Sequence, residues 1–139
     1  MKLSSKGRYA VMALTDLAKF DPEEPVSLRD ISLRQGISLV YLEQLFLKLK
    51  KHKIVVSVRG NRGGYTLFRK PSEIKILDIF IAVDEKIKTI GCEKHSKQGC
   101  NGRSSKCITH DLWNELGDYI NDFFKKKNLG DLINQTKFN

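Results

Sequence analysis

The sequence predicts a mostly α-helical fold that contains one small β-hairpin. Apolar residues recur at helical spacing in most segments of the 139-residue chain. Residues 54–68 alternate instead around a glycine-rich tip, which is the pattern of a hairpin. Its length and its hydrophobic fraction of 40% suit a single domain with a modest core. No apolar run approaches the roughly 18 residues of a membrane span, so no membrane partner is expected.

The first helix is expected to begin at Ser4 or Ser5, either of which could cap it. Its apolar residues recur at helical spacing: Tyr9, Ala10, Ala13, Leu14, Leu17 and Ala18. Val11 and Met12 widen this face, so we expect the helix to pack within the subunit and also against a partner. Two prolines in residues 21–25 then predict a loop.

Two capped helices are expected next. Ser27 can cap a short helix, with Asp30 placed as in a capping box and Gly36 ending the helix. Ser38 can cap a longer helix that has one apolar face: Leu42, Leu45, Phe46 and Leu49. A short and a longer capped helix joined by a glycine turn make a helix-turn-helix.

The opposite face of the longer helix occupies the position from which such motifs read base edges. It carries these candidate DNA contacts: Ser38, Val40, Tyr41, Glu43, Gln44, Lys48 and Lys51. The lysines could instead complement the negative end of the helix, but the basic stretch that follows favours phosphate contact. Glu43 could select sequence by accepting a hydrogen bond from a cytosine amino group, or it could be an ordinary solvated residue.

The hairpin expected over residues 54–68 follows this helix directly, so it forms a wing. Arg59, Gly60 and Arg62 are its candidate DNA contacts, because arginines at a wing tip can enter a narrow minor groove. Eight Lys or Arg and no Asp or Glu lie between Lys48 and Lys70. Together with the net charge of +9, this patch indicates double-stranded DNA as a partner.

A helix is then expected from Ser72, its cap, to near Glu85. Its expected core face carries Ile74, Leu77 and Ile81. This helix would link two regions of one compact unit. Residues 1–71 form the winged helix-turn-helix, and residues 72–139 form the linker helix, a metal-binding loop and a dimerisation helix.

Residues 91–110 contain all three cysteines and form the candidate metal site. Their pattern is C-x7-C-x6-C-x2-H, with four candidate ligands: Cys92, Cys100, Cys107 and His110. Thiolates with an imidazole suit zinc or an iron–sulfur centre and do not suit magnesium or calcium. The spacing leaves these two metal centres evenly balanced. An odd cysteine count disfavours a disulfide framework, and the absence of a secretory signal favours the cytoplasm.

Residues 108–124 are expected to form a helix with a broad apolar stripe. The stripe is Leu112, Leu116, Tyr119, Ile120 and Phe123, widened by Trp113 and Phe124. So broad a face exceeds what a small winged helix needs, which favours a homodimer interface over a helix folded back onto its own subunit. Residues 125–127, all lysine, would complement the end of this helix, and residues 129–133 suggest a short final helix.

Several segments together resemble the IscR-type iron–sulfur cluster regulators. They are MKLSSKGRYAV at Met1, ISLRQGISLVYLEQLFLKLKK from Ile31, SVRGNRGGY from Ser57, AVDE from Ala82 and CITHDLW from Cys107. The resemblance covers essentially the whole chain. The central segments are shared with the wider winged-helix family, and the C-x2-H ending is the specific part. The gaps between the cysteines are seven and six residues here and are longer than is usual in that type. The added length contains Glu93 and His95, which bear on the choice of ligand.

The resemblance implies a homodimeric transcription regulator with a [2Fe-2S] cluster on the four candidate ligands. It further implies that the assembly machinery donates the cluster and that the loaded form represses iron–sulfur assembly genes. A second class of sites would be bound even without the cluster, and the residue matching Glu43 is associated with that discrimination.

Other functions compete with this interpretation. An NsrR-type nitric oxide sensor with a [4Fe-4S] cluster is expected to use an acidic ligand in the first helix, where this chain has Arg8. A zinc-stabilised DNA-binding protein would have no switch. An iron–sulfur electron carrier would need neither a helix-turn-helix nor a basic wing. An enzyme is not expected, since no nucleophile–base pair or paired carboxylates stand at a suggestive spacing.

Overall fold

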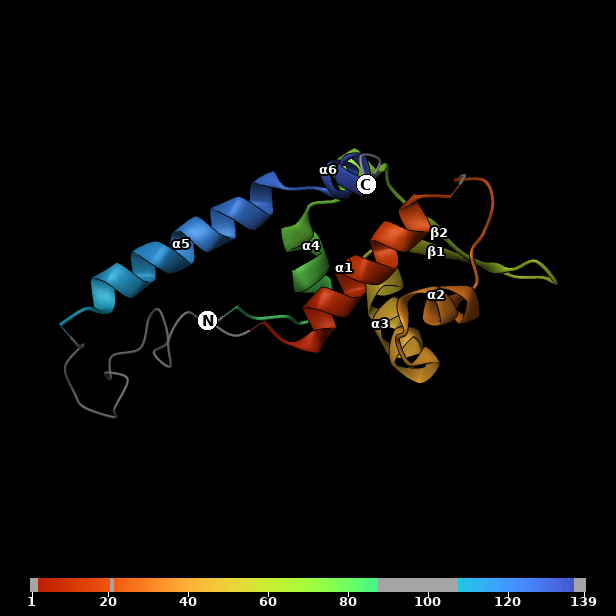
Figure 1. Cartoon of the computed structure of the whole chain (residues 1–139), viewed down its shortest axis with the longest axis horizontal. Coiled ribbons are helices and arrows are strands. Elements are labelled where there is room, and N and C mark those ends of the chain that lie inside the picture. The colour runs from red at the N-terminus through yellow and green to blue at the C-terminus, as the bar shows by residue number, and fades with distance from the viewer. Residues whose placement is uncertain (1–2, 21, 88–107, 137–139) are drawn as a thin grey trace.

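The computed structural model describes residues 3–20, 22–87 and 108–136. Its elements in order are α1 (Ser5–Ala18), α2 (Leu28–Gln35), α3 (Leu39–Lys51), β1 (Val55–Val58), β2 (Gly64–Leu67), the 3₁₀ turn η1 (Pro71–Glu73), α4 (Ile76–Ala82), α5 (His110–Lys126) and α6 (Leu129–Thr136). Figure 1 shows the hairpin with α2 and α3 at one end and α5 extending at the other. The predicted helical class with one hairpin is confirmed. None of the described helices is long and apolar enough to cross a membrane.

The core is organised around α1. Its face of small and branched residues, Ala10, Ala13 and Leu14, is fully buried, and the helix contacts α2, α3, α4, α6 and β2. Small side chains let the neighbouring elements approach closely. Ser4 is the residue at the N-terminal cap, as predicted, but its side chain makes no capping bond. Its hydroxyl donates instead to the carboxylate of Glu85.

The helix-turn-helix forms as the caps predict. The hydroxyl of Ser27 accepts from the backbone N–H of Asp30 at 3.1 Å, and that of Ser38 accepts from the N–H of Tyr41 at 3.4 Å. Gly36 ends α2 in the left-handed conformation, at φ +67°. The predicted apolar face of α3 is buried: Leu42, Leu45, Phe46 and Leu49.

The hairpin is anchored to the segment before α2. β1 and β2 pair antiparallel, with Val55 opposite Leu67. Val26 forms an isolated antiparallel β-bridge to Tyr65 of β2. Its N–H donates to the Tyr65 carbonyl at 2.9 Å, and its carbonyl accepts from the Tyr65 N–H at 2.8 Å. A Cβ at Gly64 would lie 2.4 Å from the Val26 oxygen, so this close approach requires glycine. The wing is therefore tied to the helix-turn-helix at its base.

The helix predicted from Ser72 to near Glu85 is longer than the one observed, α4 (Ile76–Ala82). A 3₁₀ turn is followed by a break, and α4 begins at Ile76 with a different buried face: Ile76, Ile79, Phe80 and Ala82. Ile74 is buried as predicted, but Ile81 is 57% exposed. The break arises because the backbone here bonds to a distant segment. The Ile76 N–H donates to the Lys127 carbonyl at 2.9 Å, and the Ile74 carbonyl accepts from the Leu129 N–H at 3.0 Å.

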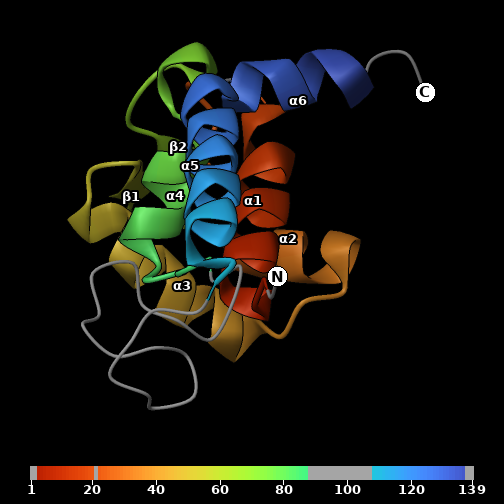
Figure 2. The same ribbon diagram turned by 90° about the vertical axis from the view of Figure 1, so that its left-hand side faces the viewer.

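The long helix α5 starts at His110, two residues later than predicted, and Ile108 lies fully exposed before it. Figure 2 shows α5 running in front of α1 and α4, with α6 crossing at one end. Near its C-terminal end, the ring of Phe124 packs edge-on against Phe80 at 4.8 Å between centroids. The short helix α6 forms as expected, with Leu129 fully buried.

Candidate DNA-binding surface and metal centre

One face of α3 is open to solvent. Val40 and Leu47 are each 64% exposed, and Glu43, Gln44 and Lys51 are exposed beside them. Two large apolar side chains exposed on one face of a helix have no folding advantage. On a recognition helix, such side chains can contact thymine methyl groups, while Gln44 can reach adenine.

Two of the candidate contacts at the start of α3 also serve the fold. Ser38 caps the helix, as described above. Tyr41 is half-buried: its hydroxyl lies 3.1 Å from the Ser5 hydroxyl, and its ring packs edge-on against Tyr9 at 5.8 Å. Tyr41 therefore fixes the N-terminal end of α3 against α1, which the sequence pattern did not indicate.

Lys48 is already engaged by an acidic residue. Its ammonium lies 3.2 Å from a carboxylate oxygen of Asp84, which directly follows Val83, the C-cap of α4. Both side chains are partly exposed, so the pair is weak and open to competition. Asp84 was not among the residues predicted for this surface, because 36 positions separate the partners.

The candidate DNA contacts of the wing are exposed to solvent. Arg59, Gly60 and Arg62 are exposed at the tip, and Figure 1 shows the tip projecting beyond α2 and α3. Gly60 has φ +127°, a conformation that other residues rarely adopt. At the base of the wing, strand β1 contacts α3. The structure thus brings the wing and the open face of α3 to one end of the molecule.

An ion pair between the buried Asp16 carboxylate and the more exposed Arg34 guanidinium joins α2 to α1. The Asp16 carboxylate accepts from the Arg34 guanidinium at 2.7 Å and 3.0 Å and from the Gln35 amide at 2.7 Å. Burial alone would raise the pKa of Asp16. The hydrogen bonds from Arg34 and Gln35, with the charge of Arg34, outweigh burial and hold that pKa below its usual value. Sequence spacing gave no signal for this contact.

His110 is the one candidate metal ligand among the described residues. It lies in the first turn of α5 and is 3% exposed, and neither ring nitrogen has a hydrogen-bond partner in the described part of the chain. A buried imidazole without a partner is costly unless something else engages it. Cys92, Cys100 and Cys107 lie outside the described residues. His110 therefore fits the role of a metal ligand.

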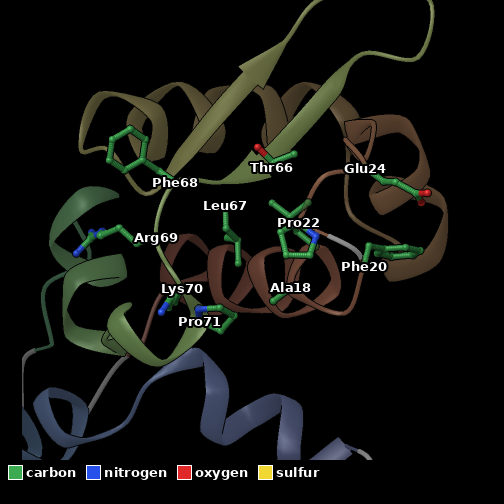
Figure 3. A pocket seen from close by; sticks show the side chains of 11 residues that line it. Ala18, Phe20, Pro22, Glu24, Thr66, Leu67, Phe68, Arg69, Lys70 and Pro71 are labelled. Carbon is green, nitrogen blue, oxygen red and sulfur yellow. The ribbon is translucent and has the colours of Figure 1, made fainter.

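A pocket of about 220 Å³ lies between the end of α1 and the segment after β2. Leu67, Pro22 and Ala18 line it, and Figure 3 shows Arg69 directed away from these side chains. The Arg69 guanidinium lies 3.8 Å from Asp78 in α4. Because its charge is directed to α4, we assign no ligand to this pocket.

A family model matches residues 3–135, nearly the whole chain, and describes Rrf2, an iron-dependent transcriptional regulator. This chain belongs to the Rrf2 family. Within Rrf2, the HTH-type transcriptional regulator IscR of Aliivibrio salmonicida is 52% identical over 133 residues, which are 96% of this chain and 77% of that protein. IscR of Photorhabdus laumondii is 48% identical over 137 residues, 99% of this chain and 82% of that protein.

Solved structures agree with the Rrf2 assignment. T. potens IscR superposes with a TM-score of 0.77 at 35% identity, covering 98% of this chain and 88% of that one. CymR, the global cysteine regulator of B. subtilis, superposes with a TM-score of 0.80 at 30% identity, covering 97% and 98%. The winged helix-turn-helix class and the resemblance to IscR are confirmed. This Rrf2 protein is an IscR-type, DNA-binding transcriptional regulator, and its relatives are named as regulators, not enzymes.

Proposed function

We propose that this protein is a homodimeric regulator that senses iron–sulfur status through a [2Fe-2S] cluster. Cys92, Cys100, Cys107 and His110 would hold the cluster. The loaded form would repress iron–sulfur assembly genes, and the assembly machinery would donate the cluster in the cytoplasm. The observation that carries the proposal is the buried imidazole of His110 at the start of α5, which has no hydrogen-bond partner among the described residues.

The chemistry of the ligand set supports a cluster at this position. His110 follows Cys107 by three residues, so one metal centre can be reached by both. Coordination through either ring nitrogen would satisfy a group that burial otherwise leaves unpaired. When bound, such a cluster would supply a charge at the start of α5 that changes with oxidation and with iron supply.

Duplex DNA would be held by α3 and the wing. The side chains of Val40, Glu43 and Gln44 would face base edges in a major groove, while Lys48 and Lys51 would meet phosphates. Arg59 and Arg62 would enter the neighbouring minor groove, with Gly60 allowing the tip to turn. Ser38 and Tyr41 would orient the N-terminal end of α3 towards the bases.

A homodimer would bury the apolar stripe of α5. The exposed fractions of four stripe residues lie between 42% and 67%: Leu112, Leu116, Tyr119 and Phe123. A groove of about 530 Å³ adjoins the stripe, lined by Met12 of α1, Phe80 of α4 and Leu132 of α6. An apolar surface this continuous favours a second copy of the chain.

Residues 1–71 and 72–139 would act as one unit in that dimer. The bridge between Lys75 and Asn128 ties the start of α4 to the segment after α5. Helix α6 also contacts α1 and η1. These contacts join the DNA-binding region to α5 on several sides.

The proposal is tested by metal analysis of protein purified without oxygen. We expect a red-brown protein with about two irons and two sulfides per chain. The visible absorption should be lost or altered in Cys92→Ala and in His110→Ala. His52→Ala is the matched control, because His52 is exposed at the end of α3 and its substitution should leave the spectrum unchanged.

Three results would replace the proposal. About four irons per chain would indicate a [4Fe-4S] sensor. One zinc in a colourless protein would indicate a structural site without a switch. An unaltered cluster in His110→Ala would remove His110 from the ligand set.

A further inference from the structure

We propose that Asp84 is a built-in competitor for the DNA phosphate at Lys48 and thereby limits how tightly the protein holds DNA. This inference rests on the proposed contact between α3 and duplex DNA. The Lys48 ammonium lies 3.2 Å from the Asp84 carboxylate. Among the described residues, Lys50 and Lys51 of the same helix form no ion pair. One α3 lysine is therefore held by an internal anion before DNA arrives.

The backbone presents the Asp84 carboxylate at a defined point. Asp84 has φ +59° and occupies the position after a helix C-cap that glycine usually takes. The Glu85 N–H donates to the Phe80 carbonyl at 2.8 Å and the Asp84 N–H to the Ile81 carbonyl at 3.3 Å, which is the pattern of a Schellman motif. Aspartate tolerates this left-handed conformation better than most residues do.

Neighbouring contacts hold this turn in place. Glu85 is buried and accepts a hydrogen bond from the Ser4 hydroxyl. Its side chain lies tightly over Gly7, where an added Cβ would be 2.7 Å from the Glu85 Cγ. On the other side, the Lys6 ammonium donates to the Asp84 carbonyl at 3.4 Å. The carboxylate of Asp84 is thus kept beside α3 by groups that do not belong to α3.

Competition follows from the exposure of the pair. The side chains of Lys48 and Asp84 are 44% and 69% exposed, so a phosphate can replace the carboxylate at little cost. Binding then loses the internal pair and places Asp84 close to a polyanion. Both effects lower affinity in a sequence-independent way, because phosphates carry no sequence information.

The test measures affinity for a mixed-sequence duplex by fluorescence anisotropy over a range of KCl concentrations, with metal-free protein throughout. Asp84→Asn keeps a residue suited to the left-handed turn and removes the charge. We expect it to raise affinity about two- to fivefold at low salt and to steepen the slope of log K against log salt by about one per subunit. Lys48→Gln should lower affinity, and Asp84→Asn should raise affinity less in the Lys48→Gln background than in the wild type, because only the repulsion between Asp84 and the phosphates is then removed.

Glu73→Gln is the matched control, since Glu73 is exposed in η1 and its substitution changes the net charge equally. The inference is overturned if Asp84→Asn does not raise affinity, if Glu73→Gln raises it as much, or if the gain from Asp84→Asn is as large in the Lys48→Gln background as in the wild type. Arg59→Gln separates this failure from that of the proposed DNA contacts. A loss of affinity in Arg59→Gln without a gain in Asp84→Asn rejects Asp84 alone.

Discussion

At the scale of single residues, the position of α2 depends on one buried carboxylate. Asp16 is 4% exposed and joins α1 to the C-terminal end of α2 through Arg34 and Gln35. The Arg34 guanidinium also stacks 4.7 Å from the ring centroid of Phe20. Since α2 in turn packs on α3, this contact helps to orient the proposed recognition helix.

Replacing Arg34 with Met should lower the free energy of unfolding by about 2 kcal/mol, because the buried carboxylate loses its charged partner. The folded-state pKa of Asp16 lies below the ordinary 3.8. The stability that the pair contributes is therefore present above that pH and is lost as pH falls through the lowered pKa. Urea unfolding from neutral pH to about pH 2 measures both effects.

Arg29→Met is the control for this measurement, because Arg29 is exposed on the same helix. It should leave the unfolding free energy within about 0.5 kcal/mol of the wild type. If Arg34→Met unfolds at the same urea concentration as Arg29→Met and with the same acid dependence, Asp16 has no such stabilising role.

At the scale of elements, the base of the hairpin is held by contacts with the rest of the fold, and, among the described residues, its tip is not. Val26 and Tyr65 bond it to the chain before α2, and the Tyr65 ring packs against Phe46 of α3 at 5.0 Å. Its tip has no such contacts in the described part of the chain, and it carries Arg59 and Arg62. Substitutions at the tip should consequently change DNA binding without changing the fold.

Arg59→Gln and Arg62→Gln should each weaken binding to duplex DNA and reduce the slope of log K against log salt by about one. Circular dichroism should show unchanged helix content. Lys125→Gln is the control, because Lys125 is exposed on α5 and its substitution removes the same charge. An equal effect of Lys125→Gln would mean that net charge, and not the position of the wing, governs binding.

At the scale of the whole molecule, the exposed stripe of α5 is separated from the DNA-binding end. Figure 1 shows α5 on the far side of α1 and α4 from the hairpin. A second copy docked along α5 would therefore leave both recognition helices free. Two linked readers hold DNA more tightly than one, because the second contact becomes intramolecular.

Leu116→Glu should convert the proposed dimer to a monomer, since it places a charge in the middle of the apolar stripe. Sedimentation equilibrium would show the mass of one chain, and duplex affinity would fall by at least about tenfold. Asn121→Glu adds the same charge at another exposed position of α5 and should remain dimeric. A wild-type protein that sediments as a monomer would refute the proposed interface.

Local patterns in the sequence were enough for much of the fold. The hydroxyls of Ser27 and Ser38 cap their helices, Gly36 ends α2, and the alternation after α3 forms the hairpin. These features depend on contacts between near neighbours in the chain, so spacing reveals them. The exposed face of α3 follows from the same rule, since burying Leu42 and Phe46 directs Val40 and Leu47 outwards.

Contacts between distant segments required the tertiary structure. The break before α4 exists because Ile74 and Ile76 bond to the chain after α5, and Lys48 meets Asp84 because α4 ends beside α3. His110 is likewise the one residue of α5 that is buried. Sequence by itself determined the family, the helix-turn-helix, the wing and the candidate ligands. Only the tertiary structure decided which charges pair and which polar groups are buried, because both depend on residues that folding alone brings together.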